Sequence, residues 1–143
     1  MKKPSENSEE FLSRIREWQA LEDKTISSAQ TLLNKSNNAL VTMTMDMIVK
    51  DSAKHKEMLQ MIVDNLEKEA VHLTPDELAP LVDLLTSHME AEAKSIAFAD
   101  EALEKSELFI TQYILSYILA DETKHHSLIN KLVELKRATI FVT

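Results

Sequence analysis

The chain contains no glycine in 143 residues. Glycine is the residue that most readily adopts a positive φ, which tight β-hairpin turns and close phosphate-binding loops require. Rossmann folds, P-loops and β-sandwiches are therefore not expected. Only three prolines interrupt the chain, and 44% of its residues are hydrophobic, enough to supply a core. The sequence predicts an all-α fold.

Acidic side chains outnumber basic ones by 24 to 16, which gives a formal net charge of −8. Such a chain repels nucleic acid and anionic lipid unless it carries a local basic patch, and the sequence shows none. No cysteine is present, which excludes disulfides, thiolate zinc sites and iron–sulfur clusters. Apolar stretches end well short of the ~20 residues of a membrane span. The acidic, amphipathic start does not resemble a signal peptide. We therefore expect a cytoplasmic location, with neither nucleic acid nor a membrane as partner.

The spacing of apolar residues predicts four long helices. Their expected ranges are about 8–35, 38–70, 74–105 and 106–136. The connections after the first and third helices are very short, so the helices on either side should be antiparallel. Hairpin one is expected at about residues 8–70 and hairpin two at about 75–137. Together they predict a single domain, residues 1–143, with an up-down four-helix-bundle architecture.

Local signals refine the helix boundaries. Thr74 followed by Pro75 and Glu77 is typical of a helix start with a capping box. Pro80 is expected to separate a short helix from the long third one, and Ser106 is expected to cap the fourth. The apolar side of the first helix is expected to include Trp18. The apolar tail, residues 138–143, is expected to pack on the bundle or on a partner.

The two hairpins also resemble each other in sequence. Shifting the chain by 70 residues without a gap aligns twelve pairs of identical residues. These pairs lie along both helices of each hairpin and in the connection between them. The aligned pairs are Glu22 with Glu92, Lys24 with Lys94, Ile26 with Ile96, Ala29 with Ala99, Leu33 with Leu103, Lys35 with Lys105, Ser36 with Ser106, Ile48 with Ile118, Asp51 with Asp121, Lys54 with Lys124, His55 with His125 and Val63 with Val133. This pattern predicts duplication of a helical hairpin.

A carboxylate and an imidazole lie on the apolar face of the fourth helix. Glu122 and His125 are three residues apart and leave the same side of a helix, which Ile118 and Leu128 also occupy. A buried carboxylate and imidazole need compensation, because an unpaired buried charge costs several kcal/mol. A bound cation supplies it, and a hydrogen-bonded Glu–His pair at the edge of the face is the alternative.

Three further candidate ligands lie on the other helices. Glu22 and Glu92 occupy matching mid-helix positions on sides expected to face inward, and His55 does so on the second helix. The choice of Glu22 depends on helix register, since Glu17, Gln19 and Asp23 lie nearby. Carboxylates with imidazoles and without thiolates suit iron or manganese, with zinc or copper also able to bind.

The duplicated four-helix pattern and the Asp-Glu-x-Lys-His motif resemble the ferritin-like superfamily of di-iron carboxylate proteins, near its rubrerythrin and bacterioferritin-type members. In that family a Glu comes from each of the first and third helices, and a Glu-x-x-His from each of the other two. The resemblance implies the following roles by position: Glu22 and Glu92 as terminal carboxylates, Glu122 as a bridging carboxylate, His55 and His125 as imidazole ligands, and Asp51 and Asp121 as aspartates that hydrogen-bond and orient the histidines.

One position departs from the family pattern. Ser52 stands where the family has its other bridging Glu, and a neutral hydroxyl cannot bridge two cations with charge. Five of six implied ligands remain, so one or two ions are expected. His88, one turn before Glu92, is either a substitute ligand or a polar neighbour at the bundle end.

These features lead to two functional hypotheses. The first is a ferritin-like protein that binds iron, or manganese or zinc, with O₂- or peroxide-linked oxidoreductase activity as an implied property. It would need an external reductant, because the chain has no cysteine-rich electron-transfer module, and a homodimer or other homo-oligomer is expected. The second is a metal-free, degenerate bundle that acts as a structural or protein-interaction module. Whether the protein is an enzyme is left open.

Overall fold

The computed structural model describes residues 9–69 and 71–135, and all regular structure within these ranges is helical. This confirms the all-α prediction. The elements are α1 (Glu9–Lys35), α2 (Ala39–Glu67), α3 (Pro75–Leu78), the 3₁₀ helix η1 (Ala79–Leu81), α4 (Val82–Lys105) and α5 (Phe109–Glu134). None of the helices in the described ranges is long and apolar enough to cross a membrane.

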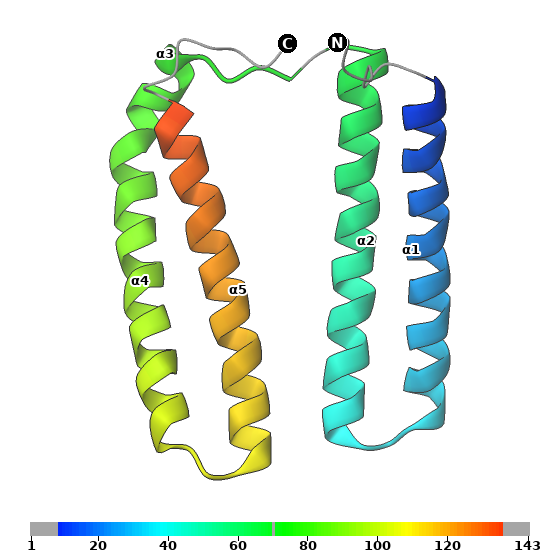
Figure 1. The fold of residues 1–143 in the computed structure, drawn as a ribbon, viewed down its shortest axis with the longest axis vertical. Coiled ribbons are helices and arrows are strands. Elements are labelled where there is room, and N and C mark those ends of the chain that lie inside the picture. The colour runs from blue at the N-terminus through cyan, green and yellow to red at the C-terminus, as the bar shows by residue number, and fades with distance from the viewer. Residues whose placement is uncertain (1–8, 70, 136–143) are drawn as a thin grey trace, which may run out of the picture. The chain divides into compact units, whose positions relative to one another are not determined.

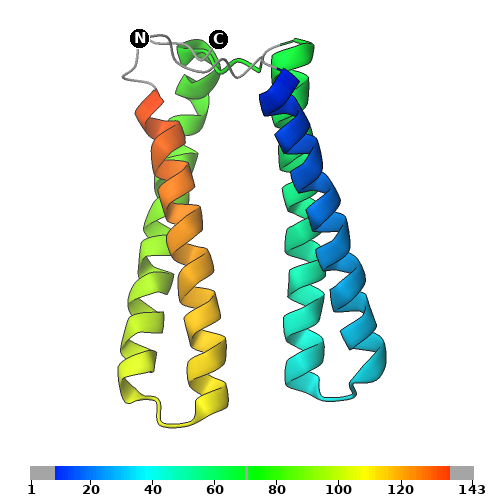
Figure 2. The same ribbon diagram turned by 45° about the vertical axis from the view of Figure 1, so that its right-hand side comes forward.

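The structure divides into two compact units, Met1–Val71 and His72–Thr143. In the first, α1 and α2 lie side by side as an antiparallel hairpin; in the second, α4 and α5 do the same (Figure 1). Figure 2 shows both hairpins from a second direction. Only residues 36–38 and 106–108 separate the paired helices. The short connections therefore produce the antiparallel neighbours that the sequence predicted.

The hairpin connections reverse direction without any positive φ among the described residues. In the first, Asn38 has an extended backbone, and its side chain accepts hydrogen bonds from the Leu40 and Val41 amides at the start of α2. This cap satisfies amides that would otherwise lack a partner at a helix N-terminus. Neither connection requires a glycine.

The two hairpins place corresponding residues at equal distances from their connections. α1 and α4 end at Lys35 and Lys105, and α2 and α5 begin at Ala39 and Phe109, so both boundaries recur after 70 residues. The small buried residues Ala29 and Ala99 share the same spacing. A residue and its counterpart 70 positions later therefore lie at the same level of their hairpins.

Two of the predicted boundary features are confirmed. Thr74 and Glu77 form a reciprocal capping box, with hydrogen bonds of 3.1 and 2.8 Å at the start of α3. Pro80 lies in η1, between the short α3 and the long α4. The apolar tail at 138–143 lies outside the described residues.

Two other boundary predictions were wrong. Ser106 ends α4, donating its amide to the Leu103 carbonyl, while Leu108 occupies the N-cap of α5 without a side-chain hydrogen bond. The extended backbone of both residues is what lets the chain reverse there. α2 ends at Glu67 rather than at residue 70, and Asn65 accepts a hydrogen bond from the Val71 amide just beyond that end. A side-chain acceptor of this kind competes with continuation of the helix.

The core of the first hairpin is a narrow seam between its two helices. Its buried residues are Leu12, Ile15, Leu59 and Val63, with Phe11 and Leu66 packed against them. The Trp18 side chain is 52% exposed within this hairpin, and its predicted packing stays a prediction. The seam continues from Ile15 through Gln19, which donates to Gln60 of α2, so Trp18 lies to one side of it. Two helices bury only the residues along their line of contact.

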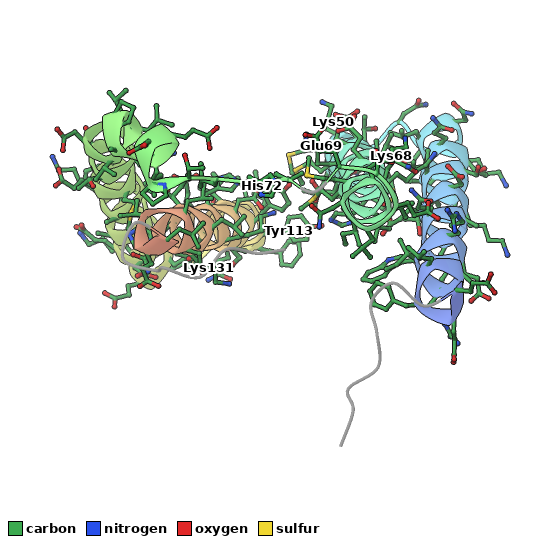
Figure 3. The ribbon with its side chains drawn as sticks, turned by 90° about the horizontal axis from the view of Figure 1, so that it is seen from above. Lys50, Lys68, Glu69, His72, Tyr113 and Lys131 are labelled. Carbon is green, nitrogen blue, oxygen red and sulfur yellow. The ribbon has the colours of Figure 1, made fainter. Side chains whose placement is uncertain are left out.

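Charged side chains form ion pairs on the exposed surface of α2. Along α2, Lys50 pairs with Asp46 and Lys68 with Asp64, and Figure 3 shows Lys50 and Lys68 in the view from above. Hydrogen bonds from Gln60 and Lys68 lower the pKa of Asp64, and a hydrogen bond to Asp46 raises the pKa of Lys50. These exposed pairs aid solubility and add little to stability.

Leu59→Ala is expected to destabilise the protein by about 2–5 kcal/mol, because it removes a side chain that is 5% exposed from this small seam. Met58→Ala is the matched control, since the neighbouring side chain is 52% exposed and its loss should change stability by within about 0.5 kcal/mol. Urea unfolding followed by circular dichroism measures both. An equal loss of stability in the two variants would contradict the assignment of Leu59 to the buried core.

Candidate metal centre

Three potential metal ligands converge in the second hairpin. Glu92 of α4 and Glu122 and His125 of α5 each offer one ligand atom, and these atoms lie within 4.8 Å of one another. The His125 Nδ1 atom is 3.5 Å from Glu122 Oε1 and 3.6 Å from Glu92 Oε2. Glu122 and His125 share a helix face because they are three residues apart. Pairing of α4 with α5 brings Glu92 to that face.

Glu92 is the most buried of the three. Its side chain is 5% exposed, against 25% for Glu122 and 47% for His125. Its Oε1 atom is buried and has no hydrogen-bond partner. A buried carboxylate oxygen without a partner is costly, and a cation is one group that compensates it. The centre therefore combines a deep carboxylate, one oxygen of which has no hydrogen-bond partner, with two donors that solvent can reach.

The two His125 contacts, at 3.5 and 3.6 Å, are close to the separation of two ligand atoms around a common ion. Hydrogen bonds from nitrogen to oxygen cluster near 2.9–3.0 Å, which is shorter than either His125 contact. Ligands bound at the 2.0–2.2 Å typical of Zn²⁺ would be separated by roughly 3.0–3.5 Å. Small side-chain adjustments would therefore suffice to place the three donors around one cation.

His88 contacts the same carboxylate from within α4. It lies one turn before Glu92, and its Nε2 atom is 3.2 Å from Glu92 Oε2. Its side chain is 59% exposed. Glu92 Oε2 thus faces two imidazoles, those of His88 and His125, while Oε1 faces none that the structure records.

The first hairpin holds a smaller group at the corresponding positions. His55 Nδ1 lies 3.3 Å from Glu22 Oε2, and Glu22 is 9% exposed. Ser52, the counterpart of Glu122, is 4% exposed. Within the described part of the chain, these residues do not form a group of three donors. The first hairpin supplies one carboxylate and one imidazole, with a buried hydroxyl beside them in the sequence.

The helix register selects Glu22 among the four polar candidates on α1. Glu17 pairs with Arg14, Gln19 with Gln60, and Asp23 with Lys56, whereas Glu22 is buried and faces His55.

Each aspartate that the resemblance assigns to a histidine lies four residues before it on the same helix. Asp121 Oδ1 is 3.4 Å from Lys124 Nζ, and Asp51 is exposed on α2. The hydrogen bonds to the histidines that the resemblance implies stay a prediction. The sequence named every member of the donor group; what it could not reveal is that Glu92 Oε1 is left without a partner.

The donor set fits a divalent transition metal. Two carboxylates and one imidazole suit Fe²⁺, Mn²⁺ or Zn²⁺. Three protein ligands leave coordination positions open, which is characteristic of catalytic rather than structural metal sites. A bound cation would compensate the buried Glu92 oxygen that has no hydrogen-bond partner.

Comparison of the chain with models of protein families, with curated proteins and with solved structures finds no match.

Proposed function

We propose that the chain is a ferritin-like metal-binding protein whose ion is held by Glu92, Glu122 and His125. The observation that carries this proposal is the buried Glu92 carboxylate, whose Oε1 has no hydrogen-bond partner and which belongs to a group of three donors with ligand atoms within 4.8 Å of one another. A hydrogen-bonded Glu–His pair would leave that oxygen uncompensated. A divalent cation compensates it and uses all three side chains.

The proposal includes packing of the two hairpins as an up-down four-helix bundle. Its support is the recurrence of helix boundaries after 70 residues and the exposure of apolar side chains on α5. Ile118, Leu128 and Leu132 are 41, 49 and 40% exposed, and no described residue of α5 is fully buried. Apolar side chains of this size favour cover by another helix. Glu22 and His55 are proposed to face the same bundle interior.

Iron is the proposed metal, with manganese or zinc as alternatives. When bound, iron would supply redox chemistry toward O₂ or peroxide. The chain's own part would be to neutralise the cation with Glu92 and Glu122, to bind it through His125, and to leave coordination positions open. Turnover requires an external reductant, since the chain has no cysteine. A homodimer or other homo-oligomer is the proposed assembly.

Metal content per chain tests this function. Tag-free protein incubated with ferrous iron under nitrogen and then desalted is expected to retain one or two iron ions in elemental analysis. Consumption of O₂ or peroxide with an added reductant would then be assayed. Failure to retain iron, manganese or zinc would contradict the metal-binding function and favour the metal-free structural or interaction role.

A further inference from the structure

We infer that the second hairpin alone holds a single divalent cation, and that the matching Glu22–His55 pair of the first hairpin holds none. This inference rests on the proposed function and specifies which half of the chain carries its ion. The duplicated sequence would by itself lead one to expect two equivalent half-sites, one in each hairpin. The structure shows that the two differ in donor number, in compensation of charge and in the surroundings of the buried Glu.

The donor number differs because of one position. At the level of Glu122, the first hairpin has Ser52, which is 4% exposed and neutral. Removal of that carboxylate leaves a single negative charge, on Glu22, to offset a divalent cation. The second hairpin offers two negative charges and an imidazole, all within 4.8 Å. Carboxylate and imidazole donors together determine affinity at such sites, so the second hairpin should bind far more tightly.

The compensation of the buried carboxylates differs as well. Among the described residues, the buried side-chain atoms without a hydrogen-bond partner are Glu92 Oε1 and Ser106 Oγ. Glu22 does not contribute such an atom, and its Oε2 lies 3.3 Å from His55. The Glu22 side chain is also less enclosed than that of Glu92, at 12% exposed against 5%. In the second hairpin, one oxygen of the buried carboxylate, Glu92 Oε1, has no hydrogen-bond partner, although Oε2 faces two imidazoles.

His88 adds a feature that the first hairpin lacks. Its Nε2 atom lies 3.2 Å from Glu92 Oε2, and the residue 70 positions earlier is Trp18. An imidazole N–H turned toward Oε2 would hold the carboxylate in one orientation for the ion. Hydrogen bonds of this kind to a ligating carboxylate commonly change metal affinity by about 10–100-fold. His88 is therefore a positioning residue of the second hairpin.

The same substitution at corresponding positions separates the two hairpins. Full-length wild type, Glu92→Gln and Glu22→Gln would be titrated under nitrogen with Co²⁺, whose visible absorption reports its coordination, and bound metal would be counted by equilibrium dialysis. Wild type and Glu22→Gln are expected to bind one ion with similar affinity. Glu92→Gln is expected to bind at least about 100-fold more weakly, since it loses the buried anionic ligand. Circular dichroism checks that each variant stays helical, and Glu122→Gln, at a more exposed position, replaces Glu92→Gln if the latter unfolds.

His88→Ala is included in the same titration. It is expected to lower the affinity by about 10–100-fold while the stoichiometry and the Co²⁺ spectrum stay those of wild type. His88→Gln, which keeps an N–H donor, should recover part of the affinity. A changed spectrum would mean that His88 is itself a ligand and would overturn its positioning role.

The outcomes distinguish the inference from the proposed function. Two ions in wild type, or an equal loss of affinity in Glu22→Gln and Glu92→Gln, would overturn the inference and leave metal binding in place. Absence of binding by wild type to both Co²⁺ and Fe²⁺ would overturn both. One ion that depends on Glu92 and not on Glu22 would support the inference.

Discussion

Replacing Glu122 and His125 together by alanine is expected to abolish metal binding while the helices persist. The double substitution removes two of the three donors and leaves only Glu92. Both side chains are partly exposed, at 25 and 47%, so their removal takes away little packing. Elemental analysis after anaerobic loading with iron measures the loss, and circular dichroism measures the helical content.

The control for this variant is His126→Ala, which removes the adjacent imidazole outside the donor group. It should retain the wild-type metal content. Metal should also raise the melting temperature of wild type, because a ligand at 100 times its dissociation constant stabilises the folded state by about 2.7 kcal/mol. The double variant should show no such shift. Full metal content in the double variant would show that Glu122 and His125 do not bind the metal.

Ser52→Glu is expected to raise the metal content from one ion per chain to two. It supplies the first hairpin with a carboxylate three residues before His55 and across from Glu22, the arrangement that Glu122 has in the second hairpin. Ser52 is 4% exposed, so the metal-free variant should be less stable than wild type, because it buries a charge. Added metal should restore much of that stability.

Ser52→Gln provides the matched comparison, since it has nearly the same size and no charge. It should bind one ion, and metal should not rescue the stability lost in the first hairpin. Elemental analysis and thermal melts with and without Co²⁺ distinguish the two variants. A content of one ion in Ser52→Glu, in a protein that remains helical, would contradict the assignment of Ser52 as the position that lost a ligand.

Much of the fold could be predicted from local patterns. Apolar spacing located the four long helices, and the capping box at Thr74 and Glu77 located the start of α3, because these features depend on residues a few positions apart. The short stretches at 36–38 and 106–108 determined the antiparallel pairing in the same way. The members of the donor group were found because Glu122 and His125 occupy an otherwise apolar face.

The errors arose where a position depends on packing rather than on local pattern. Contact with α2 determines that the seam between α1 and α2 runs through Gln19, and apolar spacing on α1 does not encode that contact. Serine is found both at the ends and at the starts of helices, so the residue type at position 106 does not determine whether it ends α4 or caps α5. The unpartnered Oε1 of Glu92 results from the exact approach of α4 and α5, which apolar spacing does not encode.

The negative φ angles of the hairpin connections have a consequence for the denatured chain. Because no described residue requires a positive φ, the protein folds without the most flexible residue type. Replacing Gly by Ala at a compatible position typically stabilises a protein by about 0.4–1 kcal/mol, chiefly by narrowing the unfolded ensemble. The unfolded chain is thus less disordered than that of a protein of the same length that contains glycine. Part of its stability therefore comes from the lower conformational entropy of its unfolded chain.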